Sequence, residues 1–265
     1  MRRLPPALGA LLFALATHAQ EAAAPPTRSG YAFDSPRVLT QQRLFGLAHG
    51  IALLAGACRA SPPHAPSSTV AYMAWQERQA PTIAAAVADL GRYYFGSAAV
   101  EPAALVRQLA LKEALDPAPD APELAAACAT LPEALAQPRY DLAARWRQEE
   151  AMAQVVVAAD IAARDRHCRE RLSDLALQLH TARYDTWREI NEPLLQQASA
   201  RLEREWPVDA PAATFAAWRA ELYRTTRAGG STADCLAFSA SLKQPDSALR
   251  NAFRLPPPQP GPTPP

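Results

Sequence analysis

The sequence predicts an all-α protein built from two tandem, divergent helical-bundle repeats of about four helices each, with one disulfide in each repeat. Three observations lead to this prediction. Ala, Leu, Arg, Glu and Gln dominate the composition, and these residues are among the better helix formers. Two distant stretches of the chain match each other without a gap, and the four cysteines fall at equivalent places in the two halves.

The first 19 residues have the three-part pattern of an export signal. Arg2 and Arg3 give a positive start, residues 8–16 form a short apolar run, and Ala19 ends a small-residue cleavage site. The run is too short to span a bilayer, which needs about 20 apolar residues. We therefore expect cleavage near Ala19, a periplasmic or secreted location, and no transmembrane segment in the mature chain.

Composition divides the mature chain into four parts. Residues 20–38 are rich in Ala and Pro and are expected to form a flexible arm. The first repeat is expected over residues 39–140 and the second over residues 141–254. The tail at residues 255–265 is dominated by proline, so we expect it to be extended, disordered and unpacked.

The repeat is clearest where residues 71–90 align with residues 183–202, because seven of 20 positions are identical at an offset of 112. Each stretch contains a Tyr and a Trp three residues apart, on one face of a helix, followed by a Pro. We interpret them as core anchors of the repeats. A Pro within a helical pattern also predicts a kink or break there. The six residues are Tyr72, Trp75 and Pro81, and Tyr184, Trp187 and Pro193.

The cysteines are Cys58, Cys128, Cys168 and Cys235, and their flanking residues repeat at offsets of 110 and 107. An even number of cysteines in an exported chain indicates disulfides. Each repeat supplies one early and one late cysteine, so we expect the pairs Cys58–Cys128 and Cys168–Cys235. Pairing across the two repeats is the main alternative.

The junction of the two repeats contains no Pro or Gly over residues 139–180. This stretch is therefore expected to be one continuous helix that ends the first repeat and begins the second. Two helices joined by a turn near Ala151 are the alternative.

A cluster of aromatic residues lies at residues 91–96, with the sequence GRYYFG. Consecutive residues of a helix point in different directions, so at least one of Tyr93, Tyr94 and Phe95 is expected to be exposed. Trp206 stands at the corresponding place of the second repeat. These four aromatic residues are candidates for partner binding. Packing at the interface between the repeats explains them equally well.

No sequence motif for catalysis, cofactor binding or metal binding is present. The chain has no HExxH, no GxSxG, no glycine-rich phosphate loop and no CxxC. Without Arg2 and Arg3 the chain has 25 basic and 26 acidic residues, which gives no strong field for nucleic acid. We therefore expect no catalytic residues, no cofactor, no metal and no nucleic-acid partner.

These observations favour an exported, non-enzymatic binding or scaffold protein of the bacterial cell envelope. A protein or peptide partner is expected, and the groove between two repeats is a natural place for it. The order of an early cysteine, an aromatic helix and a late cysteine-bearing helix resembles that of small helical periplasmic immunity proteins of cell-wall amidase toxins. This resemblance, in cysteine order and helical composition alone, implies a periplasmic inhibitor or immunity-type protein as an alternative. An enzyme with an unrecognised carboxylate or histidine site is the other alternative.

Overall fold

The computed structural model describes residues 25–115, 121–207, 210–244 and 247–257, and these residues form eight α-helices and no strand. The predicted all-α class is confirmed. The helices are α1 Pro36–Cys58, α2 Ala65–Phe95, α3 Pro102–Gln108, α4 Pro122–Leu135, α5 Leu142–Arg169, α6 Asp174–Arg204, α7 Phe215–Thr225 and α8 Thr232–Ser241. Two short 3-10 turns, η1 Pro138–Tyr140 and η3 Leu249–Asn251, lie between or after them.

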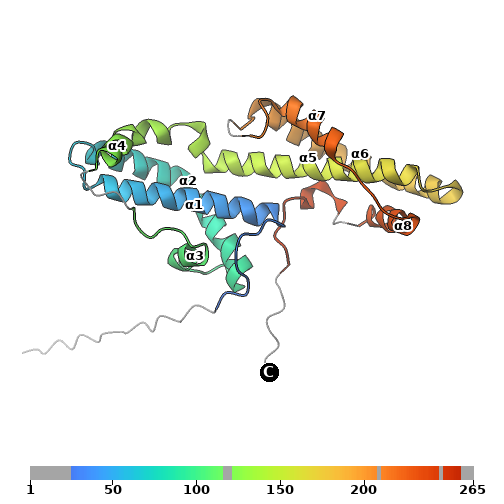
Figure 1. The fold of residues 1–265 in the computed structure, drawn as a ribbon, viewed down its shortest axis with the longest axis horizontal. Helices are drawn as coiled ribbons and strands as arrows, with labels where there is room; N and C mark the ends of the chain where they lie inside the picture. Colours follow the sequence, from blue (N-terminus) through green and yellow to red (C-terminus); the bar gives the residue numbers. More distant parts are fainter. Residues whose placement is uncertain (1–24, 116–120, 208–209, 245–246, 258–265) are drawn as a thin grey trace, which may run out of the picture.

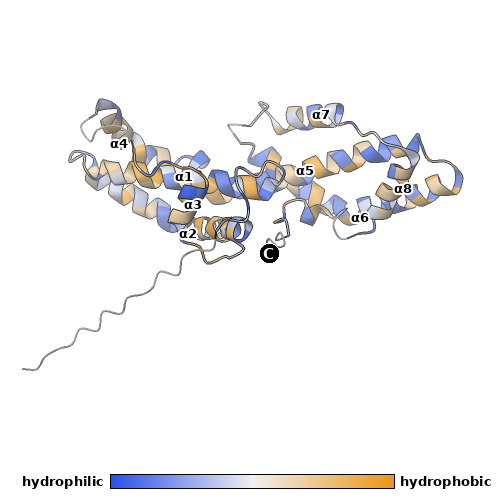
Figure 2. Cartoon of the chain, turned by 60° about the horizontal axis from the view of Figure 1, so that its bottom comes forward, coloured by the Kyte–Doolittle hydropathy of each residue, from blue (hydrophilic) through white to orange (hydrophobic). Residues whose placement is uncertain are grey.

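The helices form two halves that lie end to end along the long axis of the molecule (Figure 1). In the first half α1 packs along α2 and α4 contacts both helices; in the second half α5 packs along α6 and α8 contacts both. The shorter helices α3 and α7 contact α2 and α6 respectively. Helix α5 also contacts α1 and α2, so it joins the two halves. Orange and blue residues alternate along the long helices in Figure 2, as expected for helices with one buried face.

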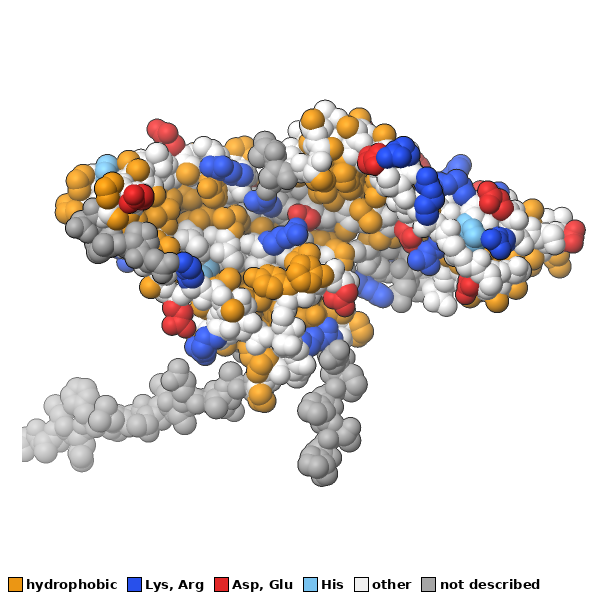
Figure 3. All heavy atoms as spheres, viewed as in Figure 1, with side chains coloured by type: hydrophobic (Ala, Val, Ile, Leu, Met, Phe, Trp, Pro, Cys, Tyr) orange, Lys and Arg blue, Asp and Glu red, His pale blue; other side chains and the backbone are white. Residues whose placement is uncertain are grey.

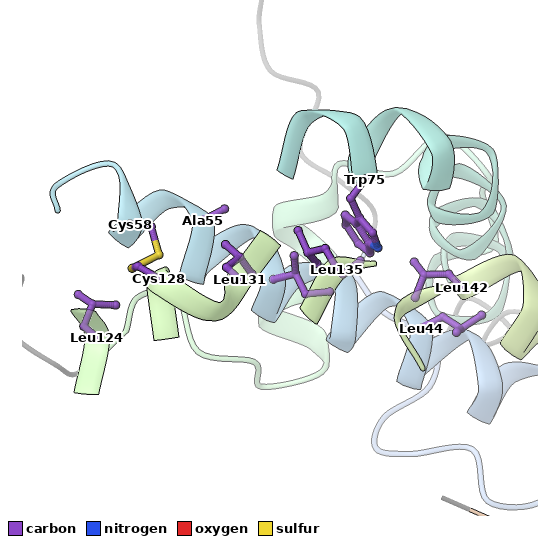
Figure 4. Packing of buried hydrophobic residues seen from close by; sticks show 11 residues of the cluster. Leu44, Ala55, Cys58, Trp75, Leu124, Cys128, Leu131, Leu135 and Leu142 are labelled. Carbon is purple, nitrogen blue, oxygen red and sulfur yellow. A yellow bond between two sulfur atoms is a disulfide. The ribbon is translucent and has the colours of Figure 1, made fainter. Parts of the chain in front are cut away.

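One of the two core clusters of the first half is a row of apolar side chains with a disulfide near one end (Figure 4). Cys58 of α1 is bonded to Cys128 of α4, and Trp75 of α2 lies further along the row. Leu142, the first residue of α5, is fully buried in this cluster. Helix α5 therefore starts inside the core of the first half.

The core of the second half consists of three smaller clusters along α5 and α6. Val155 and Leu202 pack with Phe215 of α7, and Ile161 and Trp187 pack close by with Leu242 and Leu249. The last cluster contains the second disulfide, which joins Cys168 of α5 to Cys235 of α8. Both disulfides join the cysteines that we paired from the sequence, with separations of 70 and 67 residues.

Pro81 and Pro193 differ from the sequence prediction in two ways. Helices α2 and α6 are each 31 residues long and continue through their proline, so of the predicted kink or break the break is absent. Both prolines are exposed and are not core anchors. A proline in a helix leaves the backbone carbonyl four residues before it without a donor. When the proline is on the water side, solvent can bind this carbonyl, while the buried face of the helix packs before and after the proline. Trp75 and Trp187 are buried as expected, and Tyr72 and Tyr184 are partly buried beside them.

The junction between the halves also differs from the expected single helix. Helix α5 ends at Arg169 and α6 begins at Asp174, so the chain turns at residues 170–173 and not near Ala151. Leu172 of this turn is buried in the cluster around the second disulfide. The turn thus brings an apolar side chain into the core, which a straight helix would not do.

The two ends of the described chain are packed, contrary to the expectation of a flexible arm and an unpacked tail. The backbone N–H of Thr27 donates a hydrogen bond of 2.7 Å to the carbonyl oxygen of Tyr94, Ala32 is buried, and α1 begins at Pro36. Leu255 of the tail packs on the apolar cluster that contains Ala32 and Tyr94. The expected signal at residues 1–19, the first part of the expected arm at residues 20–24, and the rest of the tail at residues 258–265 lie outside the described residues.

In the part of the chain that the structure describes, none of the helices combines the length and the apolar character needed to cross a membrane.

Candidate functional site: a groove along helix α6

Tyr94, a candidate for partner binding, is a core residue. It is fully buried, its hydroxyl group donates a hydrogen bond of 2.5 Å to the carbonyl oxygen of Gly30, and it accepts one from Nε2 of Gln42. Burial raises the pKa of the Tyr94 phenol to about 12, and the hydrogen bond from Gln42 opposes part of this shift. The interpretation of Tyr94 as a partner contact is therefore wrong, because residues of the N-terminal segment cover it.

Tyr93 and Phe95 are partly buried, and Tyr93 is covered by the two ends of the chain. The guanidinium carbon of Arg28 lies 4.3 Å from the centre of the Tyr93 ring, and Nη2 of Arg28 donates a hydrogen bond of 3.0 Å to the carbonyl oxygen of Pro257. The chain thus supplies its own contacts to this aromatic segment. None of the three consecutive aromatic residues is fully exposed, and Tyr93 and Phe95 keep part of their surface in solvent.

Trp206 lies in the other half of the molecule, in a different environment. Its indole Nε1 donates a hydrogen bond of 2.7 Å to the carbonyl oxygen of Ala212. Its ring packs 5.7 Å from that of Phe215 and 5.4 Å from that of Trp218. Trp206 therefore fixes the loop before α7, and the structure does not bring the four candidate aromatic residues together.

The anchor residues Trp75 and Trp187 each bind the backbone of the segment that follows the second cysteine of their half. The indole Nε1 of Trp75 donates to the carbonyl oxygen of Tyr140 at 2.8 Å, and that of Trp187 donates to the carbonyl oxygen of Ser247 at 2.7 Å. The tryptophans therefore fix where each half closes, in addition to filling the core.

A buried polar group lies beside the second disulfide. Asp165 of α5 accepts two hydrogen bonds of 2.9 Å from Nε of Arg169, and Nε2 of His180 lies 3.1 Å from its Oδ1. The pKa of Arg169 is raised, chiefly by its hydrogen bond to Asp165. His180 is fully buried and its Nδ1 has no hydrogen-bond partner.

A carboxylate paired with a histidine is a common part of a catalytic site, but a nucleophile and access for a substrate are needed as well. All four cysteines are in disulfides. The cavities described below are lined by neither Asp165 nor His180. The group is therefore best explained as a polar contact between α5 and α6 inside the core.

One cavity lies between the two halves, where a groove was expected. It has a volume of about 450 Å³ and is lined by α1, α5 and Pro207, Ala210 and Pro211. Arg43 of α1 and Glu149 of α5 face each other across it, with Nη1 of Arg43 3.8 Å from Oε1 of Glu149. The charges that line this cavity are thus partly satisfied within the protein.

The second cavity is a groove of about 540 Å³ along α6, which we call the α6 groove. One wall is α6 and the other is the segment from Leu242 to Arg250, as far as that segment is described. Its apolar lining includes Leu179, Trp187 and Ile190. Leu179 is 47% exposed and Ile190 is 64% exposed, although both are large apolar residues. Arg183, Lys243 and Arg250 complete the lining with three positive charges.

The row of exposed apolar residues on α6 extends beyond the groove. Leu175, one turn before Leu179, is 66% exposed. The row lies on a different side of α6 from the buried Trp187 and Asn191. Figure 3 shows that charged side chains of both signs are scattered over the face drawn there, with apolar side chains between them. A row of three large apolar residues on one helix is the kind of surface that proteins use to bind other proteins.

Comparisons with protein-family models, with curated proteins and with solved structures give no match for this chain. The function has to be inferred from the site alone. Within the described ranges, no group of three or more His, Cys, Asp or Glu residues could hold a metal ion.

Sequence reasoning missed the α6 groove. The signal was present, because Leu175, Leu179 and Ile190 lie on another face of the helix than Trp187. Apolar residues on two faces of one helix indicate that the helix packs on two sides. The neighbouring wall, however, is some 60 residues away along the chain, and only the fold places it beside α6.

Proposed function

We propose that this chain is an exported, non-enzymatic helical binding protein of the cell envelope that engages a protein or peptide partner through the α6 groove. The observation that carries the proposal is the exposure of Leu179 and Ile190 beside a groove of about 540 Å³. Large apolar side chains that remain in water cost free energy, and a partner that covers them recovers it. The two disulfides are compatible with a periplasmic or extracellular location.

We also propose that the two halves are divergent copies of one bundle. The order of helices, the position of the disulfide and the tryptophan contact to a backbone carbonyl are the same in both halves. The copies differ in the surface that a partner would use. At the offset of 112, Leu179 and Ile190 correspond to Ser67 and Arg78 of α2. This difference supports a division of roles, in which the second copy has the binding groove.

The α6 groove is a better candidate than the cavity between the halves. The apolar surface of the cavity between the halves lies beside an arginine and a glutamate that face each other. The α6 groove instead has exposed apolar residues and positive charges with no carboxylate among its described lining residues. A partner therefore gains more from contact with the α6 groove.

Site-specific photo-crosslinking in cells tests the proposal. The full-length chain is expressed with a photoreactive residue at Leu179 or Ile190, or at Val70 as a control. Val70 is 71% exposed on α2, the helix that corresponds to α6, and lies outside the groove. We expect one identified protein to be cross-linked from positions 179 and 190 and not from position 70.

The captured protein is then purified and titrated against the wild type, Ile190→Asp and Val70→Asp. Both substituted side chains are exposed, so the fold is expected to be retained. The proposal is supported when Ile190→Asp weakens binding and Val70→Asp leaves it unchanged. Equal cross-linking from all three positions, or equal binding by both variants, would contradict it.

A further inference from the structure

The chemistry of the α6 groove also indicates what kind of partner it binds. We infer that its occupant is an acidic amphipathic helix of the partner protein. This inference rests on the proposed function, because it assumes that the α6 groove is the binding site. It is argued from the charges around the groove and from the spacing of the residues along α6.

The three cations of the groove have no acidic partner in the described part of the chain. No ion pair is found for Arg183, Lys243 or Arg250 among the described residues, and none of the described lining residues is Asp or Glu. Arg183 donates one hydrogen bond, 3.2 Å from Nη1 to Oγ of Ser239, and its buried Nε has no acceptor. Three positive charges that have no acidic partner among the described residues, beside an apolar floor, favour a ligand with carboxylates at its edges.

The spacing along α6 favours a helix as the occupant. Leu175, Leu179, Ala182, Thr186 and Ile190 are separated by four, three, four and four residues, so they form one row along the helix. All five are exposed, or nearly so, in the folded chain. The small residues stand in the middle of the row and the large ones at its ends.

A second helix packs most closely where the side chains between two helices are small, and large residues at both ends then enclose it. From Leu175 to Ile190 the row covers 16 residues, or about 22 Å of helix. This length matches an amphipathic helix of four turns with apolar residues at i, i+3 or i+4, and i+7. Its carboxylates would lie beside Arg183, Lys243 and Arg250.

The test uses the disulfide-bonded mature chain and two synthetic helical peptides of about 18 residues. The peptides share the same apolar positions, and their polar positions are Glu in one and Lys in the other. Binding is measured by fluorescence anisotropy of labelled peptide. We expect the Glu peptide to bind at least about tenfold more tightly than the Lys peptide, with an affinity that falls as salt is added.

Two sets of variants separate the charges from the fold. Lys243→Glu/Arg250→Glu should reverse the preference between the two peptides. Arg78→Glu/Arg107→Glu removes two exposed arginines of the first half and should leave the preference unchanged. Leu179→Gln, which keeps all charges, should weaken the binding of both peptides. Circular dichroism with thermal unfolding confirms that each variant is folded.

Several results would overturn the inference. Equal binding of the two peptides, or no binding of either, excludes an acidic helix as the occupant. Two other occupants are tested with Ile190→Asp as the control. If the wild type binds anionic phosphatidylglycerol vesicles but not the Glu peptide, and Ile190→Asp loses the binding of vesicles, the groove would be assigned to a membrane. If light scattering shows that the wild type dimerises and Ile190→Asp does not, the groove would be assigned to a second copy of the chain.

The peptide experiment fails separately from the cross-linking experiment. If positions 179 and 190 cross-link one identified protein while the Glu peptide does not bind, the chemistry assigned to the partner is wrong and the groove remains a binding site. If positions 179 and 190 cross-link only the proteins that position 70 also cross-links, the proposed function and this inference are both rejected.

Discussion

Gln79 and Asn191 each accept a backbone hydrogen bond, through one side-chain amide oxygen, from the segment that follows the late cysteine of their half. Oε1 of Gln79 accepts a hydrogen bond of 3.0 Å from the backbone N–H of Leu142, and Oδ1 of Asn191 accepts one of 2.8 Å from Leu249. Gln79 and Asn191 are 112 positions apart and the two leucines are 107 apart, which are the offsets of the matching sequence blocks around them. The contact therefore agrees with the proposal that the halves are copies.

Replacing either of these two residues should destabilise the protein. Gln79→Leu leaves the buried N–H of Leu142 without an acceptor, and Asn191→Leu does the same to Leu249. We expect each change to lower the free energy of unfolding by about 1–3 kcal/mol, measured by urea unfolding. Gln196→Ala, on an exposed position of α6, is the control and should stay within about 0.5 kcal/mol of wild type. A Gln79→Leu variant as stable as this control would show that the hydrogen bond contributes nothing.

Asp165 and His180 should depend on each other. At the offsets of 110 and 112, the first half has Ala55 and Ser68 in their places. Asp165→Ala leaves the buried His180 without its acceptor and removes the carboxylate beside the exposed Arg169, and we expect a loss of about 1–3 kcal/mol. The double variant Asp165→Ala/His180→Ser should lose about 0.5–3 kcal/mol less than the sum of the two single variants. Additive losses in a double-mutant cycle of thermal or urea unfolding would rule out the pairing.

Tyr94 should give the protein a sensitivity to alkali. Burial raises the pKa of its phenol from the usual 10.0 to about 12 in the folded state. The stabilisation from keeping the phenol protonated is therefore complete below pH of about 10 and is lost as the pH rises towards about 12. Tyr94→Phe lacks the ionisable group, so its free energy of unfolding should fall less than that of wild type over this range. Parallel curves for the two proteins in urea titrations between these pH values would contradict the assignment.

Tyr94→Ala tests the same residue as part of the core. The side chain is fully buried between the N-terminal segment and α2, so we expect a loss of about 3–5 kcal/mol. Thermal unfolding of the variant measures this loss. A variant that unfolds at the wild-type temperature would show that Tyr94 is not a core residue, and would again favour its interpretation as a partner contact.

Each disulfide should stabilise the protein by about 4 kcal/mol, because each closes a loop of similar length in the unfolded chain. Cys58→Ala/Cys128→Ala and Cys168→Ala/Cys235→Ala should therefore have similar losses in urea unfolding. Peptide mapping without reduction checks the pairing directly. A peptide that links Cys58 to Cys168 would contradict both the structure and the repeat.

The sequence was sufficient to predict the features that depend on local spacing. The helical class, the buried faces with Trp75 and Trp187, and the pairing of the cysteines all follow from residues close together or from the repeat itself. The continuity of α2 through Pro81 could not be predicted, because packing of the buried face of α2 outweighs the lost hydrogen bond only in the folded chain.

The features that sequence reasoning missed depend on segments far apart in the chain. Tyr94 is buried by residues more than 50 positions before it, and Tyr93 is covered by Arg28 together with the C-terminal segment. The α6 groove likewise needs its second wall from the segment after α8. Periodicity along one helix shows which residues are apolar, but it does not show which distant segment covers them.

Helix α5 contributes buried residues to the cores of both halves. Its first residue, Leu142, is buried among side chains of α1, α2 and α4. Further along the helix, Val155 and Ile161 are buried with α6 and its neighbours. Neither half can melt without exposing apolar surface of the other. The molecule should consequently lose its structure in a single cooperative step on heating, and the two halves produced by cleavage within α5 should each fail to fold alone.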